Sequence, residues 1–437
     1  MIHPLFRPDL GTNVLTSGKL IEGVATHAQW AGGPLITFGH RPVIWSKTGA
    51  RVDTRILCGF SNEILNRQMF DLARTIRFPL SKRIIRSQLL EEEPFVLVDI
   101  GCSGGINAIW REFGDKLNAI GFDPNISDCE RLQQAETNPH VKYVAGFVTA
   151  PPDHPFRSIY NEGRWGRNPW DRLSVSAAQA HRLATSQTPR LSGTRKEDKY
   201  ADPSDEIVLA DFLKSEGFEY VDFIKMDTDG DDLIILESLR GHLEGLSVSG
   251  LAVEINFFGT QSPTDHTFHN VDRLLKEKNF ELFDLATRRY SVAALPSKFQ
   301  YLFPAQSKTG RVWQGDALYL RDAANPEYAQ DVAGWSVGRL AKLCCLFEFS
   351  RLPDCAAEIV VSFRSRFEPY IDVGGALDDL ASHELKKRTS YDEYLARFRR
   401  DDPVFYKRQF IKGRPRQALA YLVRNLPLER SRRKTFL

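Results

Sequence analysis

Residues 96–105 (VLVDIGCSGG) form an apolar run that ends at Asp99 and passes into a glycine-rich turn. Glycine lets the backbone come close to a ligand, and open α/β sheets bind ligands at the carboxyl ends of their strands. A carboxylate suits a ligand with a positive or hydroxyl-rich end. The turn lacks the G-x-G-x-x-G spacing of dinucleotide sites. S-adenosylmethionine, which carries an ammonium, a sulfonium and ribose hydroxyls, is therefore the better match.

A second acidic residue, Asp123, ends the next apolar run in NAIGFDPN, 24 residues after Asp99. A carboxylate there can accept hydrogen bonds from both ribose hydroxyls. Aspartate before proline is also a common turn residue, but its occurrence together with Asp99 favours binding. We expect the donor-binding residues to be Asp99, Gly101, Cys102, Ser103, Gly105, Asp123, Pro124 and Asn125.

The segment YVDFIKMDTDGDDLIILESL places Lys225 and Asp227 two residues apart, so both point to the same face of a strand. A lysine inside a buried run is uncommon unless it is paired or functional. Methyl transfer to a hydroxyl requires a group that takes the hydroxyl proton. Our candidate for this base is Asp227, with Lys225 orienting it or stabilising a developing alkoxide. Glu254 in LAVEINFF is the second choice.

Two other interpretations of these polar residues stay open. Asp227, Asp229 and Glu254 offer the oxygen ligands that Mg²⁺ prefers, although such carboxylates more often cap or orient. Three histidines, His181, His266 and His269, are more often surface or structural residues than catalysts.

Strand and helix patterns alternate from Phe95 to about Arg321, which predicts a doubly wound parallel sheet. INAIWREFGDKL reads as a helix and VKYVAGFVTA as one strand. No helical pattern separates the last two strands, FELFDLA and DALYLRD, so they can form an antiparallel pair, as in a methyltransferase sheet and unlike a dehydrogenase sheet. We therefore predict a Rossmann-like methyltransferase domain over residues 91–323.

Three further segments surround or interrupt this domain. Residues 1–90 read as an accessory segment, and residues 324–437 as a helical, basic extension. The insertion at 151–203 is rich in Pro, Gly, Ser and Arg. A loop of this length is either a substrate lid or an insertion without chemistry.

The four segments VDIGCSGG, GFDPN, VDFIKMDTDGDDLIILESL and LAVEINFF, in this order, resemble the FkbM-type methyltransferase family. The resemblance covers about residues 94–323. It implies a class I Rossmann-like methyltransferase fold and O-methylation of a hydroxyl, often on a sugar or glycan-related acceptor. Ser103 stands where the family commonly has Asn, and Asp229 and Asp232 stand where Glu or Gln is usual. These changes keep the polarity of each position.

Charge is unevenly distributed along the chain of 437 residues, whose formal net charge is +2. From His383 to the last residue there are 16 Lys and Arg against 6 Asp and Glu. Residues 404–437 are therefore expected to be a solvated tail, or to contact an acidic partner or an anionic membrane surface. The sequence has no signal-peptide pattern, no spanning apolar run and few cysteines, which predicts a cytoplasmic protein with reduced thiols.

Two alternative functions remain beside O-methyl transfer. A nicotinamide-dependent oxidoreductase would use a related sheet, but the glycine spacing and the closing strand pair argue against it. A non-catalytic binding module would keep the fold without the chemistry. Against that alternative, Asp99, Gly101, Asp123, Lys225 and Asp227 are all present together.

Overall fold

The computed structural model describes residues 78–157, 199–202, 204–228, 230–290 and 310–405. It also describes the backbone of three short strands, β1 (Ile36–Phe38), β2 (Arg41–Trp45) and β3 (Arg51–Val52), which pair as a small antiparallel sheet. Asp229, most of the predicted insertion, and residues 406–437 of the basic tail lie outside the described residues.

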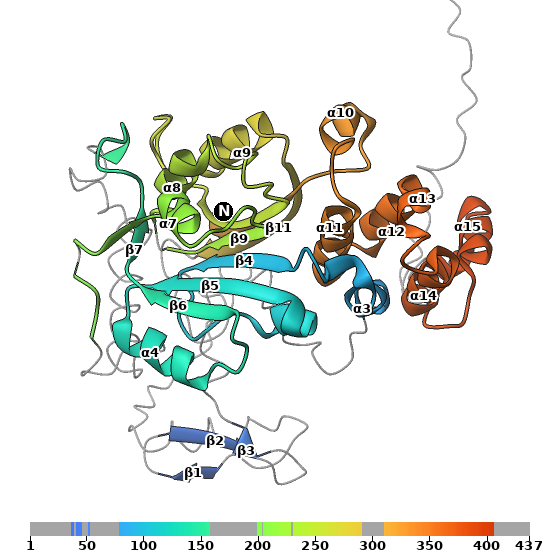
Figure 1. Cartoon of the computed structure of the whole chain (residues 1–437), viewed down its shortest axis with the longest axis horizontal. Helices are drawn as coiled ribbons and strands as arrows, with labels where there is room; N and C mark the ends of the chain where they lie inside the picture. The colour runs from blue at the N-terminus through green and yellow to red at the C-terminus, as the bar shows by residue number, and fades with distance from the viewer. Residues whose placement is uncertain are drawn as a thin grey trace, which may run out of the picture.

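The centre of the structure is a sheet of seven strands (Figure 1). Its order is β11-β12-β10-β9-β4-β5-β6. The strands are β4 (Phe95–Ile100), β5 (Leu117–Asp123), β6 (Val141–Ala145), β9 (Phe223–Met226), β10 (Gly250–Asn256), β11 (Glu281–Tyr290) and β12 (Arg311–Leu320). The neighbours from β6 to β10 are parallel, whereas β12 runs antiparallel to both β10 and β11. The predicted Rossmann-like methyltransferase sheet with an antiparallel closing strand is confirmed.

One face of the sheet is covered by α7 (Leu209–Ser215), α8 (Asp232–Leu239) and α9 (Phe268–Glu277), which lie together above it in Figure 1. Each parallel strand sends alternate apolar side chains into this layer, among them Val98, Ile224 and Leu251. Helix α8 is mostly apolar and buried, because it lies against the sheet with little of its surface facing water.

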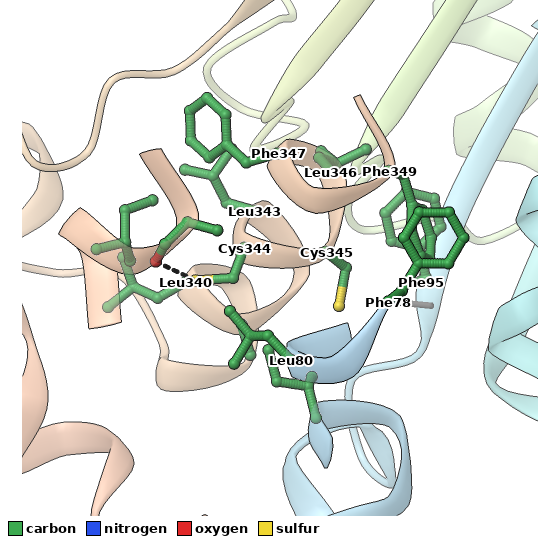
Figure 2. Close-up of a cluster of buried hydrophobic side chains, with 14 of the residues drawn as sticks. Phe78, Leu80, Phe95, Leu340, Leu343, Cys344, Cys345, Leu346, Phe347 and Phe349 are labelled. Carbon is green, nitrogen blue, oxygen red and sulfur yellow. Dashed lines mark hydrogen bonds between the residues drawn. The ribbon is translucent and has the colours of Figure 1, made fainter. Parts of the chain in front are cut away.

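The opposite face is covered by segments from distant parts of the sequence. They are α3 (Pro79–Arg86), η2 (Gln88–Leu90), η3 (Ala108–Lys116) and α11 (Val337–Phe349). Figure 1 shows α3 and α11 side by side at the edge of the sheet. Figure 2 shows Cys344, Cys345 and Phe349 of α11 gathered with Leu80 and Phe95. The predicted C-terminal extension therefore shares a core with the sheet.

A buried glutamate of α11 fastens α3 to it. Helix α3 has no side-chain cap of its own. Instead, Glu348 accepts hydrogen bonds from the backbone N–H groups of Leu80 and Ser81, at 3.2 and 2.7 Å, and from the Ser81 hydroxyl at 2.6 Å. A carboxylate at a helix N-terminus satisfies unpaired N–H groups and complements the helix dipole.

The remaining elements complete the core or lie at its edges. They are α4 (Ile126–Ala135), β7 (Phe147–Thr149), β8 (Glu206–Val208), η6 (Pro326–Tyr328), α10 (Ala329–Val332), α12 (Pro353–Ser362), α13 (Arg364–Phe367), α14 (Val373–Leu385), α15 (Tyr391–Arg399) and η7 (Pro403–Phe405). Strands β7 and β8 form a separate parallel pair. The cysteines of the described residues are free thiols. None of the described helices is long and apolar enough to span a membrane.

Candidate active site

The sheet face that packs against α11 changes from apolar to charged along the strands. At the end of the sheet where the parallel strands begin, Leu97, Phe223 and Leu318 are buried in the core. Toward the carboxyl ends of the parallel strands the same face carries charged side chains, because alternate residues share a face. They are Asp99, Asp123, Lys225, Asp227, Glu254, Arg288 and Asp316, all of them buried. Five carboxylates thus stand beside two cations, an excess of negative charge where open sheets bind ligands.

Lys225 joins the ends of the two central strands. Its Nζ lies 3.1 Å from Oδ1 of Asp99 on β4 and 3.6 Å from Oδ2 of Asp227 after β9, and it donates a 2.7 Å hydrogen bond to the Gly101 carbonyl. Burial works against its charge, but Asp99 and Asp227 raise the pKa of Lys225 above its ordinary value. Burial raises the pKa of Asp99, and Lys225 opposes this. The sequence spacing predicted the shared face of Lys225 and Asp227; the pair with Asp99 depends on strand order.

The glycine-rich turn is built for close contact between strands. Gly101 has a φ of +77°, and a Cβ there would lie 1.9 Å from the Asp227 carbonyl oxygen. Its N–H and that of Cys102 both donate to Phe122 O, while the Gly105 N–H donates to Cys102 O. These donors are already used within the protein, which disfavours the pyrophosphate of a dinucleotide.

The side chains of this turn differ in their surroundings. Cys102 is buried, and its Sγ would lie 2.7 Å from a Cβ at Gly121 of β5, so the thiol packs on that strand. Ser103 is exposed. A ligand bound at this turn would contact the backbone of Cys102 and the side chain of Ser103.

One carboxylate oxygen of Asp123 stabilises the turn after β5, and the other is available to a ligand. Its Oδ1 accepts a 2.8 Å hydrogen bond from the Asn125 N–H, and the Asn125 side chain caps α4 by accepting from Asp128 N at 3.0 Å. Oδ2 accepts no hydrogen bond from the described residues. Burial raises the pKa of Asp123. The turn function and the predicted ribose-binding function are therefore compatible. Pro124 contributes its carbonyl, which accepts from Ala201 N at 2.7 Å.

Glu254 is held by an arginine that the sequence did not reveal. Arg288 on β11 reaches Oε1 of Glu254 at 2.6 Å and Oδ1 of Asp316 on β12 at 2.9 Å. Burial raises the pKa of Glu254 well above its ordinary value, and Arg288 opposes this. Only the insertion of β12 between β10 and β11 brings these three side chains together.

His266, in the loop between β10 and α9, also reaches this edge of the sheet. Its Nε2 lies 2.8 Å from the Glu254 carbonyl oxygen, and its Nδ1 lies 4.0 Å from Oδ2 of Asp232 at the start of α8. Its imidazole side chain is buried in the candidate site, a position that no local sequence pattern indicates.

Several buried atoms at this edge lack a hydrogen bond within the described residues. They are Oδ1 of Asp231, Asp232 and Asn256, Nδ1 of His266 and Nε1 of Trp313. Buried polar groups are normally hydrogen-bonded, so a set of unsatisfied ones marks a place built for a polar ligand. Within the described residues, no three His, Cys, Asp or Glu side chains are arranged to hold a metal. The predicted Mg²⁺ ligands Asp227 and Glu254 lie in ion pairs instead.

The topology of the sheet is that of the Rossmann-like methyltransferase fold. The closing strand β12 is antiparallel. In the glycine-rich turn, the N–H groups of Gly101, Cys102 and Gly105 donate to backbone carbonyls of the protein. The excess of buried carboxylates at this end of the sheet fits a cationic methyl donor. Residues 120–282 match the family model described as the methyltransferase FkbM domain, which confirms the predicted resemblance over those residues. None of the curated proteins matches the chain.

The chain is also similar to solved methyltransferase structures at low identity. A TehB-like S-adenosylmethionine-dependent methyltransferase from Corynebacterium glutamicum is 12% identical, with 58% of this chain and 93% of that chain covered and a TM-score of 0.23. A methyltransferase from Aquifex aeolicus is 10% identical, with 58% and 97% covered and a TM-score of 0.23. Magnesium protoporphyrin IX methyltransferase from Synechocystis, solved with bound SAH, is 9% identical, with 62% and 100% covered and a TM-score of 0.24.

Proposed function

We propose that this protein transfers the methyl group of S-adenosylmethionine to a hydroxyl of a saccharide or glycan-related acceptor. The observation that supports S-adenosylmethionine as the methyl donor is the excess of buried carboxylates at the carboxyl ends of β4, β5, β9 and β10. A cationic ligand offsets that excess, whereas a dinucleotide adds to it. The hydroxyl and the saccharide come from the family resemblance.

Each residue of the site has a separate part in this proposal. Asp123 accepts the ribose hydroxyls through Oδ2, and the turn at Gly101 supports the donor beside it. The donor supplies an electrophilic methyl group. Asp227 accepts the hydrogen bond of the acceptor hydroxyl, aligns its oxygen and takes its proton as the methyl group is transferred, while Lys225 fixes Asp227 in place. Alignment of reacting groups accounts for much of the acceleration in such transfers.

Glu254 is a weaker candidate for the base than the sequence suggested, because Arg288 already engages its carboxylate at 2.6 Å. We propose that Glu254 and Arg288 form the wall of the acceptor side instead. Mg²⁺ is not part of the proposal.

Calorimetric titration of the full chain with S-adenosylmethionine and with NAD tests the donor. We expect binding of the first and none of the second; the reverse result would establish the oxidoreductase alternative. Incubation with methyl-labelled donor and a panel of sugar nucleotides and oligosaccharides tests the acceptor. Label in an alkali-stable ether on one of them supports O-methylation. Donor binding without transfer to any acceptor would favour the non-catalytic module.

We also propose that the basic segment 404–437 contacts an acidic partner or an anionic membrane surface, and that the protein is cytoplasmic. The support is its ten Lys and Arg against one Glu from residue 406 onward. Sedimentation with vesicles of phosphatidylserine and phosphatidylcholine, for the full chain and a chain ending at residue 405, distinguishes a membrane from a protein partner. Equal sedimentation of the two chains would exclude the membrane as the surface that this segment contacts.

A further inference from the structure

Three side chains that accept hydrogen bonds lie together at the carboxyl ends of β9 and β10. The two strands are parallel, and Met226 is paired with Val253. The next residues, Asp227 and Glu254, therefore lie side by side, on strands that run about 5 Å apart. Asn256 follows Glu254 by two residues, so it shares the same face of the sheet.

Each of these side chains has an oxygen that accepts no hydrogen bond within the described residues. Oδ2 of Asp227, 3.6 Å from Lys225, and Oδ1 of Asn256 are buried and have no hydrogen-bond partner there. Arg288 donates to Oε1 of Glu254 at 2.6 Å, and Oε2 accepts no hydrogen bond from the described residues. Buried acceptors without a donor are costly. The three oxygens therefore mark positions where a ligand donates hydrogen bonds.

The cations of this side of the site are already engaged. Lys225 is paired with two aspartates, and Arg288 with a glutamate and an aspartate. Arg289 and Arg311, at the adjoining ends of β11 and β12, are exposed. Nε1 of Trp313 is a buried donor without a partner in the described residues, but it is uncharged. An anionic group bound here would meet carboxyl groups without a cation of its own, and like charges repel strongly at such distances.

A hydroxyl group suits these oxygens, because it donates one hydrogen bond and carries no charge. Hydroxyls on adjacent carbons of a sugar ring can donate to carboxyl groups on adjacent strands. The positive charge that offsets the carboxylates comes from S-adenosylmethionine.

We propose that the sugar residue that receives the methyl group is uncharged and is held by its other hydroxyls, which donate hydrogen bonds to Glu254 and Asn256. The inference rests on the proposed function and narrows its substrate class. The reacting hydroxyl lies at Asp227, the neighbouring hydroxyl donates to Glu254, and a further one donates to Asn256. A uronic acid or a phosphorylated ring is excluded from this position. A charged group further along the acceptor molecule lies outside it.

Transfer of labelled methyl by the full chain to matched pairs of methyl glycosides tests the charge. The pairs are the methyl glycosides of glucose, galactose and mannose, each with its uronic acid. We expect kcat/KM to be at least about 10²-fold higher for the neutral member of every pair that is methylated. Equal rates, or transfer to the uronic acid alone, would overturn the inference and leave methyl transfer to a saccharide in place.

Saturation-transfer NMR of the same glycosides, with S-adenosylhomocysteine bound, gives a measurement that needs no turnover. We expect signals from a neutral glycoside and none from its uronic acid. If the methyl donor binds and no neutral glycoside does, this inference is overturned. If the methyl donor itself does not bind, the proposed function is wrong.

Asn256→Ala tests the proposed contact with the sugar. We expect kcat/KM for the best neutral glycoside to fall at least about tenfold, with donor affinity unchanged. One monodeoxy analogue of that sugar should show a similar fall with the wild type, and the variant should methylate this analogue as the wild type does.

Asn118→Ala is the matched control. Asn118 is a half-buried asparagine near the start of β5, at the opposite end of the sheet, and its removal should change neither quantity. A loss in Asn256→Ala that is equal for the sugar and for every deoxy analogue would overturn the contact between Asn256 and the sugar.

Discussion

Asp99 and Asp123 end neighbouring strands but differ in what their removal leaves behind. Asp99 is the closer partner of Lys225, so Asp99→Ala leaves that buried ammonium with Asp227 at 3.6 Å. Breaking a buried ion pair from one side costs about 3–5 kcal/mol. Asp123→Ala removes one hydrogen bond to Asn125, worth about 1 kcal/mol. We expect the urea midpoint of unfolding to fall strongly in Asp99→Ala and slightly in Asp123→Ala. Equal midpoints in the two variants would contradict the ion-pair argument.

The donor affinity of Asp123→Ala should separate binding from folding. Asp123→Ala should bind S-adenosylmethionine at least about tenfold more weakly with its fold intact, because it loses the acceptor of the ribose hydroxyls. Calorimetric titration measures this directly. Unchanged affinity in a folded Asp123→Ala protein would remove Asp123 from the donor site.

Asp227 is expected to affect the rate more than donor binding. Asp227→Asn keeps the size of the side chain but cannot accept the hydroxyl proton. We expect transfer to the acceptor identified by the panel to fall by about 10²- to 10⁴-fold, with donor affinity changed by less than about threefold. Single-turnover transfer of labelled methyl, compared with calorimetric affinity, gives both quantities. Wild-type turnover in this variant would exclude Asp227 from the reaction.

The residues that sequence reasoning found and missed differ in the range of their contacts. Lys225 and Asp227 lie on one strand, so their shared face followed from the two-residue period. Arg288 reaches Glu254 from β11 across β12, and His266 reaches the site from the loop before α9, so both contacts depend on tertiary structure. No local pattern specifies these contacts. The sequence predicted that Gly101 permits a close approach of the backbone to a ligand. In the structure, the close approach at Gly101 is to the Asp227 carbonyl.

At the scale of elements, the alternating pattern predicted which segments form the central strands but not every boundary. VKYVAGFVTA reads as one strand, yet Gly146, at a φ of +156°, divides it into β6 and β7. INAIWREFGDKL reads as a helix, but residues 108–116 form 3₁₀ turns with a kink at Gly114. In both segments a glycine with positive φ ends a regular pattern that hydrophobic spacing alone would continue.

Helix α11 depends on a buried lysine for its position against the sheet. Lys342 is fully buried, 2.9 Å from both Asp222 and Glu93 and over the Tyr220 ring. Lys342→Ala leaves Asp222 buried without its cation, at a cost of about 3–5 kcal/mol. Lys116→Ala, which removes a surface ion pair with Glu91, is the matched control and should leave the urea midpoint unchanged.

The loss in Lys342→Ala should grow with pH. Burial raises the pKa of Asp222 to about 6, above its ordinary 3.8. The folded state then binds the proton more tightly than the unfolded chain, so stability falls as pH rises from about 4 to about 6. Without Lys342 the carboxylate is harder to ionise, and the fall should be steeper. Urea midpoints of wild type and variant should differ more at about pH 7.5 than at about pH 4.5. A constant difference would show that Asp222 does not need the lysine.

At the scale of the whole molecule, the predicted boundary at residue 323 marks a change of sequence pattern inside one hydrophobic core. Every residue of α11 from Leu340 to Phe349 is buried, including Lys342 and Glu348. Part of that surface lies against Phe95 of β4 and Phe113 of η3, with the Phe349 ring 5.4 Å from that of Phe113. A sequence shows that such a helix is buried, but not which element buries it.

Residues 91–323 alone should therefore fail to fold cooperatively. Their removal from the chain exposes Leu97, Phe223, Leu318 and Leu320, which α3 and α11 cover in the structure. An exposed apolar face of this kind favours aggregation or a loosely packed state. A chain of residues 78–405 keeps the described contacts of this core and should unfold in one transition at the urea midpoint of the full protein. Circular dichroism and urea unfolding of the two fragments measure the difference. A cooperative transition in 91–323 would show that the methyltransferase sheet is an independent domain and that the helices only rest on it.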